Sequence, residues 1–223
     1  MNKVKKMIIF VLIVIISIIF IILIDFKKRN DELINNNDQG TIIIYSDTDQ
    51  TVVDPYDVFI DLAIEIAKNE PTYPEVNGET IYAALFGHPT YEWCTEFVLY
   101  CLQQAEIQLD TTYINDVYPW YDSAYSCGLF YIHNNRYFLS GTYAPVKGDL
   151  IFFDTDGSGY PNHTGLVIGT KHEYGIDFVI TIEGNIPGDD IPQIRIRQLP
   201  LDYNDILAYG SSFSISDYAK SSY

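Results

Sequence analysis

The sequence has few basic residues. Lys and Arg number 13 against 30 Asp and Glu in 223 residues, a formal net charge of −17. Six of the basic residues precede position 30, so from Asp31 onward seven basic residues face 29 acidic ones, and the net charge there is −22. Such a surface repels anionic polymers and anionic lipid, so we expect no nucleic-acid partner.

Cysteine is also scarce, at three residues, which excludes a fold held by several disulfides. The odd count leaves at least one thiol free even if Cys101 and Cys127 form a disulfide. Cys94 is the natural candidate for the free thiol.

One long hydrophobic run is present, near the N-terminus. Met7–Ile24 has 18 residues without a charge, which is the length that a helix needs to cross a bilayer. A cleavable signal peptide is the alternative, but the run is longer than a usual signal core and no small-x-small cleavage site follows it. We therefore expect a transmembrane anchor in contact with the lipid bilayer. Three basic residues flank it on each side, so charge leaves the orientation open.

A helical repeat begins at Cys94, within Tyr91–Ile107. Residues at offsets of 3, 4, 7, 8 and 11 from it share one face of a helix; they are Phe97, Val98, Cys101, Leu102 and Ala105. With Thr90 as N-cap and Glu92 in the first turn, Cys94 falls within that turn. Unpaired amides and the positive dipole end favour a thiolate there, as a cysteine nucleophile requires. A buried structural cysteine is the alternative.

The rest of the chain predicts helices followed by strands. Asp57–Asn69 has apolar residues at helical spacing, and Thr80–Phe86 could form one short turn within an irregular loop. After Pro145, short β-type runs alternate with turn residues; they span residues 148–153, 164–169, 178–182, 193–199 and 206–209. This order indicates an α+β domain with an antiparallel sheet. Apolar and basic residues alternate over residues 194–197, which is typical of a strand with one buried face and one solvent-exposed face.

The segment Leu109–Tyr143 is rich in aromatic residues and reads as a loop. Aromatic residues in such a segment either pack into the core or line a cleft for sugar or peptide. On the second alternative, Trp120 is a candidate substrate-binding residue. Trp93, directly before Cys94, is another.

A cysteine nucleophile needs a base and a group that orients the base. His163 opens a predicted strand, and Gly165 on the same face leaves room for another side chain. Glu183 and Asn185 end the next strand, and antiparallel pairing brings that end beside the start of the His163 strand. The order and spacing of these residues make them candidate catalytic partners of Cys94.

The segment Asp154–Gly159 resembles the start of a calcium loop, because carboxylates alternate along it. No bidentate Glu follows at the required spacing, so a tight Asp/Gly turn is the better interpretation. We expect neither a metal site nor a cofactor.

Three stretches together resemble the CHAP family of cysteine- and histidine-dependent amidohydrolases and peptidases: WCTEFVLYCLQQAEI, PVKGDLIFFDTDGSGYPNHTGLVIG and TIEGN. The resemblance covers about residues 57–210. It implies a papain-like fold and cleavage of amide bonds in peptidoglycan, with Cys94 as nucleophile, His163 as base, Glu183 as the orienting acid and Asn185 as a further site residue. Many members have Gln before the cysteine, whereas this chain has Trp93, so an oxyanion would rely on backbone N–H groups.

These features predict a single-pass protein of the cell membrane that hydrolyses peptidoglycan outside the cytoplasm. The expected segments are a cytoplasmic N-terminus (residues 1–6), the anchor (7–24), a polar tether (25–56), the CHAP-like catalytic domain (57–213) and a polar tail (214–223). An endopeptidase of the NlpC type is one alternative; it would have a polar residue other than Glu in third place. A catalytically silent wall-binding or assembly scaffold is another.

Overall fold

A computed structural model describes residues 42–43, 52–88, 92–188 and 190–212. The chain divides into two compact units, residues 1–55 and 56–223. In the first unit, strands β1 (Ile42–Ile43) and β2 (Val52–Val53) pair antiparallel. The expected anchor lies outside the described residues. Among the helices that the structure does describe, none has both the length and the apolar character for a membrane span.

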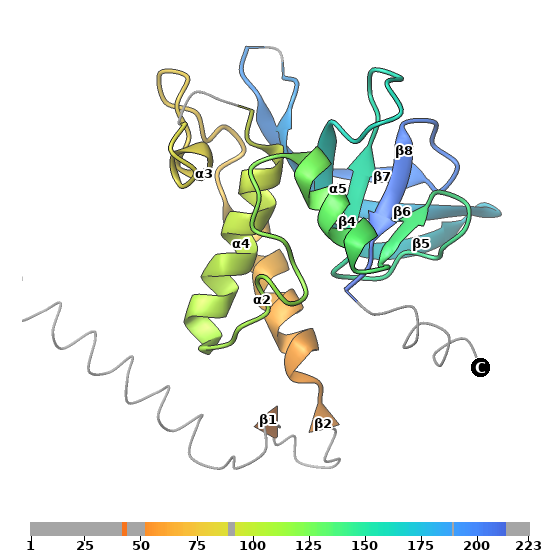
Figure 1. Ribbon diagram of the computed structural model, residues 1–223, viewed down its shortest axis with the longest axis horizontal. Coiled ribbons are helices and arrows are strands. Elements are labelled where there is room, and N and C mark those ends of the chain that lie inside the picture. Colours follow the sequence, from red (N-terminus) through yellow and green to blue (C-terminus); the bar gives the residue numbers. More distant parts are fainter. Residues whose placement is uncertain (1–41, 44–51, 89–91, 189, 213–223) are drawn as a thin grey trace, which may run out of the picture. The chain divides into compact units, whose positions relative to one another are not determined.

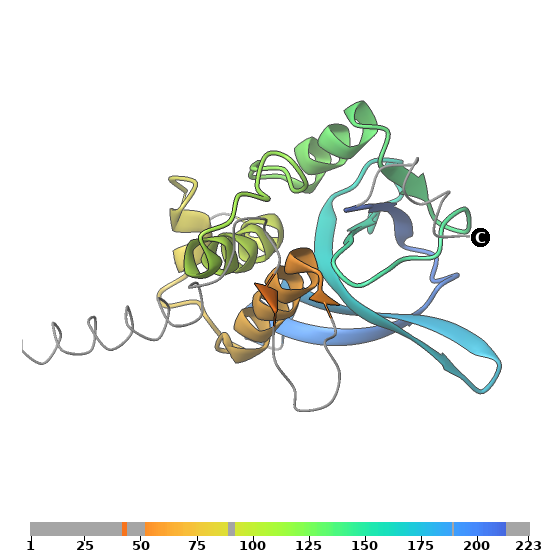
Figure 2. The same ribbon diagram turned by 90° about the horizontal axis from the view of Figure 1, so that it is seen from below.

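The second unit is built on a six-stranded sheet in the order β3-β8-β4-β5-β6-β7. Every neighbouring pair of strands is antiparallel. The strands are β3 (Tyr137–Leu139), β4 (Leu150–Phe153), β5 (His163–Glu173), β6 (Ile176–Ile186), β7 (Gln193–Pro200) and β8 (Ile206–Gly210). The long strands β5 and β6 curve strongly, with α2 and α4 on their convex side (Figures 1 and 2).

Four helices belong to this unit: α2 (Pro55–Asn69), α3 (Ile81–Ala84), α4 (Cys94–Leu109) and α5 (Ala124–His133). Thr80 caps α3, since its hydroxyl accepts a hydrogen bond from the Ala83 N–H. Helix α4 ends at Asp110, which has a left-handed backbone conformation. The expected helix at Tyr91–Ile107 is therefore present, but it begins later, at Cys94. Thr90, its expected N-cap, lies outside the described residues.

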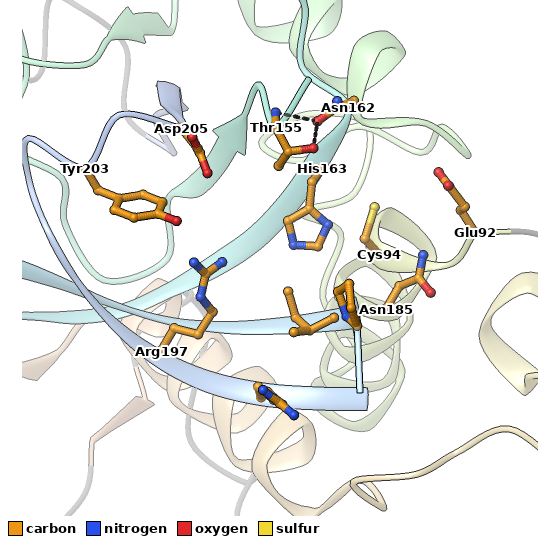
Figure 3. A pocket seen from close by; sticks show the side chains of 12 residues that line it. Glu92, Cys94, Thr155, Asn162, His163, Asn185, Arg197, Tyr203 and Asp205 are labelled. Atoms are coloured by element: carbon orange, nitrogen blue, oxygen red, sulfur yellow. Dashed lines mark hydrogen bonds between the residues drawn. The ribbon is translucent and has the colours of Figure 1, made fainter. Parts of the chain in front are cut away.

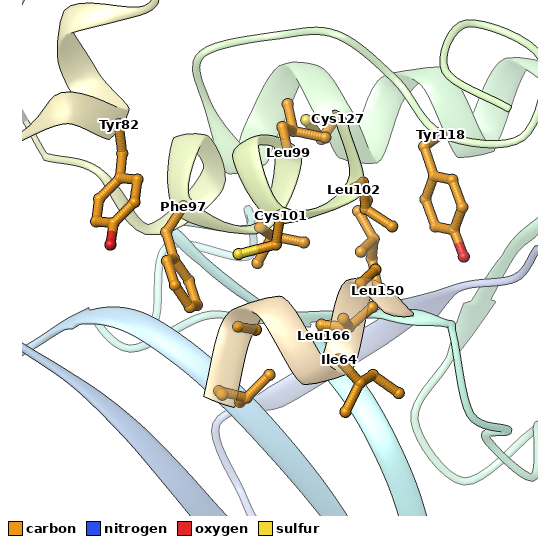
Figure 4. Packing of buried hydrophobic residues seen from close by; sticks show 14 of the residues in the cluster. Ile64, Tyr82, Phe97, Leu99, Cys101, Leu102, Tyr118, Cys127, Leu150 and Leu166 are labelled. Atoms are coloured by element: carbon orange, nitrogen blue, oxygen red, sulfur yellow. The ribbon is translucent and has the colours of Figure 1, made fainter. Parts of the chain in front are cut away.

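Two hydrophobic clusters lie on opposite faces of the sheet. The helices share the first cluster with alternate residues of the strands, among them Leu150, Leu166 and Ile182. Figure 4 shows Phe97, Cys101 and Leu102 of α4 pointing into this cluster. The second cluster contains the intervening strand residues: Ile151, Phe153, Val167, Val179, Leu199, Ile206 and Tyr209, with Tyr143. Alternation along the strands thus places α4 against one face only.

The mixed helical and antiparallel architecture confirms the predicted α+β class. The aromatic segment Leu109–Tyr143, predicted to be a loop, contains helix α5 and strand β3, so that prediction is wrong for these residues. Cys101 and Cys127 are both buried and both free, so the candidate disulfide between them is absent. The predicted wet and dry faces of β7 are also wrong in part, because Ile196 on this edge strand is 56% exposed.

We predict that Gly184→Ala lowers the free energy of unfolding by about 1–3 kcal/mol. A Cβ at Gly184 would lie 2.6 Å from Trp93 Cζ3 and 2.7 Å from Phe97 Cβ, so helix α4 could not pack as closely on β6. Chemical denaturation of both variants and the parent measures this. Gly169→Ala in β5 is the matched control, because a Cβ there meets nothing within 4 Å. Equal stability of Gly184→Ala and the control would contradict the packing argument.

Candidate active site

Cys94 is the first residue of α4 and lines a cleft of about 570 Å³. It is 6% exposed, so its sulfur meets this cleft without being open to bulk solvent. The amides of the first helical turn have no partners within the helix and carry the positive end of its dipole. No side chain caps this helix end at Trp93. The start of α4 therefore presents unpaired N–H donors beside the cleft that Cys94 lines.

His163 is the first residue of β5, and its imidazole faces the Cys94 sulfur (Figure 3). The other ring nitrogen, Nε2, lies 2.9 Å from Glu183 Oε2. The imidazole is thus held between a thiol and a carboxylate, with 12% of its side chain exposed. The three side chains therefore lie together in an order that suits a nucleophile, a base and an orienting acid.

Glu183 is fully buried, and it accepts hydrogen bonds from three neighbours. Besides His163, the Thr181 hydroxyl donates to Oε1, and Arg197 Nη1 lies 3.0 Å from Oε2. Burial alone would raise the pKa of this carboxyl, but the partners outweigh it and lower the pKa below its usual range. Gly165 leaves room for the Glu183 side chain, since a Cβ at position 165 would lie 2.5 Å from Glu183 Cγ. Glu183 is therefore ionised at neutral pH.

The pKa of His163 is raised to about 9 from its ordinary 6.5. Burial acts in the opposite direction, but hydrogen bonds and charges from Cys94 and Glu183 outweigh it. The imidazole consequently carries its second proton at neutral pH. A protonated imidazole beside the sulfur is the electrostatic partner that a thiolate requires.

Asn185 lines the same cleft, near Cys94 (Figure 3). Its φ of 59° lies in the left-handed region, at an irregularity in the pairing of β6 with β7. Asn tolerates this conformation better than most residues. This irregularity in the pairing accompanies a bend at the end of β6, where Asn185 and Ile186 line the cleft.

Residues 86–185 match the family model of the CHAP domain. This part of the chain is a CHAP domain. The match includes all four expected catalytic residues: Cys94, His163, Glu183 and Asn185. The family consists of cysteine- and histidine-dependent amidohydrolases and peptidases. No curated protein and no solved structure matches the chain.

The two tryptophans expected to bind substrate lie elsewhere in the CHAP domain. Trp93 is 1% exposed and packs against Tyr82 and Phe97, while its indole N–H donates to Glu75. Trp120 is partly buried and stacks on Phe86 at 4.9 Å. Neither tryptophan is among the residues that line the cleft beside Cys94.

Arg197 is the site residue that the sequence analysis missed. Besides its bond to Glu183, its guanidinium lies 5.5 Å from the ring centre of Phe153 and 5.7 Å from that of Tyr203. These contacts hold the cation beside Glu183 Oε2, the same oxygen that His163 Nε2 contacts. Arg197 lies beyond the matched residues, and only its alternation with Arg195 on β7 hinted that it shares a face with Glu183.

The Asp154–Gly159 segment forms a turn closed by its own backbone. Asp154 accepts from the amides of Ser158 and Gly159, and Asp156 accepts from Ser158. These carboxylate oxygens are thus engaged by N–H donors, as in an Asp/Gly turn. Over residues 42–43, 52–88, 92–188 and 190–212, no group of three or more His, Cys, Asp or Glu residues could hold a metal ion.

We predict that His163 titrates near pH 9 in the folded protein and at lower pH in Cys94→Ala, which retains the burial but loses the sulfur. Because the folded pKa exceeds the ordinary value, the pairing stabilises the fold fully below about pH 6.5, and this contribution disappears as the pH rises through about 9. NMR titration of the imidazole resonances measures the pKa. A wild-type value at or below 6.5, or no change in Cys94→Ala, would refute the pairing.

Proposed function

We propose that this protein is a membrane-tethered peptidoglycan hydrolase that cuts an amide bond with Cys94 as nucleophile. The observation that carries the proposal is the position of His163, which faces Cys94 with one nitrogen and lies 2.9 Å from the buried carboxylate of Glu183 with the other. Membership of residues 86–185 in the CHAP family supports amide hydrolysis as the reaction class.

In the proposed reaction, the Cys94 thiolate attacks the carbonyl carbon of the amide. Backbone N–H groups at the start of α4, including that of Cys94, stabilise the oxyanion. The imidazolium of His163 gives its proton to the leaving amine, and a thioester remains on sulfur. His163 then takes a proton from water, which attacks the thioester and releases the acid and the thiolate. Glu183 keeps the imidazole oriented and balances its charge.

Glu183 favours this proposal over an NlpC-type endopeptidase, for which a polar residue other than Glu was expected in third place. The buried ionic site also weighs against a silent scaffold. Holding a buried carboxylate, an imidazolium and a guanidinium together costs desolvation energy that a binding surface does not need.

We predict that Cys94→Ser and His163→Ala each remove nearly all turnover, because one lacks the nucleophile and the other the proton carrier. Glu183→Gln should reduce kcat/KM by about 10- to 1000-fold, since the amide still accepts a hydrogen bond but does not balance the imidazolium charge. The assay is release of soluble fragments from purified peptidoglycan. Mass analysis of their new ends identifies the bond.

His172→Ala and His133→Ala are the controls for the triad variants and should retain activity within about threefold. His172 pairs with Asp177 on an exposed hairpin, and His133 is an exposed residue at the end of α5. All variants must first show the circular dichroism and unfolding midpoint of the parent. Loss of activity in His172→Ala equal to that in His163→Ala would overturn the assignment, as would substantial activity in Cys94→Ser.

The proposal places the catalytic domain outside the cytoplasm, held by an anchor at residues 7–24. The apolar run of 18 residues supports this, together with the location of the substrate. A cysteine introduced at Asn36, in the tether, should therefore react with a membrane-impermeant maleimide on intact cells, whereas one introduced at Asn2 should react only after lysis. Labelling in the reverse pattern would contradict the topology.

A further inference from the structure

Arg195 has a different setting from three of the six Lys and Arg residues that the structure describes. Lys147 pairs with Asp61, Lys171 with Glu173, and Arg197 with Glu183. No Asp or Glu carboxylate among the described residues lies within ion-pair distance of Arg195, which is exposed at the cleft. The chain has a net charge of −17, yet this cleft arginine has no carboxylate partner among the described residues, which suggests that a ligand supplies the anion.

The guanidinium of Arg195 is nevertheless held in place. Its Nε donates to Gln193 Oε1 at 2.9 Å, and Gln193 is only 5% exposed. Gln193 is itself confined by the preceding loop, since a Cβ at Gly188 would lie 2.1 Å from Gln193 Nε2. With Nε engaged by a fixed partner, the two terminal nitrogens are left to present N–H donors in a fork that matches a carboxylate.

Arg195 belongs to the same cleft as the nucleophile. It lies opposite Glu183 in the register of β7 with β6, and it lines the cleft together with Asn185 and Pro187. Glu92 and Asp205 also line the cleft, and Arg197 is already committed to Glu183. A substrate that reaches Cys94 therefore enters a cleft in which Arg195 has no carboxylate partner among the described residues.

We propose that Arg195 binds a carboxylate of the substrate and so selects stem peptides that carry a free carboxylate close to the scissile amide. Peptides in which this group is a primary carboxamide are bound less well, because the amide offers one acceptor and no charge. The inference rests on the proposed function and adds the substrate class to it. Arg195 makes the same contact in the ground state and the transition state, so its effect falls on KM rather than kcat.

The test compares soluble peptidoglycan fragments with the same fragments after carbodiimide coupling to ammonia, which converts carboxylates to carboxamides. The wild type should cleave the untreated fragments with a kcat/KM about 10- to 100-fold higher. Arg195→Gln should lose this preference through a higher KM for the untreated form, and Arg195→Lys should keep part of it. Lys171→Gln, a change on the distant hairpin, is the matched control and should keep the full preference.

The outcomes separate the two proposals. Failure of the wild type to cleave either form would refute the proposed function itself. Cleavage of both forms with equal kcat/KM would refute the role of Arg195 and leave the hydrolase intact. A preference that survives in Arg195→Gln would likewise refute that role and assign the recognition to another group in the cleft.

Discussion

The buried charge of Glu183 is the interaction on which the site depends. Burying an ionised carboxylate such as that of Glu183 costs much free energy unless hydrogen-bond donors surround it. Three side chains from three adjacent strands meet this need: His163 on β5, Thr181 on β6 and Arg197 on β7. The antiparallel register is what places them together. The same carboxylate raises the pKa of His163 and so keeps the imidazole protonated. The donor that the buried Glu183 needs is therefore also the positive charge beside Cys94.

Two glycines connect this charge to the rest of the fold. Gly165 leaves the volume that Glu183 occupies on one face of the sheet, and Gly184 lets Trp93 and Phe97 approach the opposite face. Because Glu183 and Gly184 are neighbours, the carboxylate and the helix contact the same point of β6 from its two sides. Cys94, at the beginning of that helix, is thereby brought to the imidazole. The packing of α4 on β6 therefore also determines where the Cys94 sulfur lies relative to His163.

Cys94, His163 and Glu183 became candidates because the periodicity of their elements is visible locally: Cys94 and His163 each begin an element, and Glu183 lies near the end of one. Helix α5 was missed although Ala124, Cys127 and Tyr131 have helical spacing, because the exposed Tyr125 and the half-buried Phe130 leave the helix without a clear polar face. Arg197 could not be assigned, since its bond to Glu183 depends on strand register. The position of Trp93 next to Cys94 in the sequence did not place its side chain in the cleft, because successive residues at the start of a helix point in different directions.

In the proposed reaction His163 activates Cys94, and the rate at which iodoacetamide alkylates each cysteine at pH 7 tests this activation directly. Burial raises the pKa of the Cys101 and Cys127 thiols well above their usual range, so these two should stay unlabelled. Cys94 should be alkylated in step with loss of activity, and about tenfold or more slowly in His163→Ala. Equal rates at Cys94 in the two proteins, or full activity after complete alkylation, would contradict the claim.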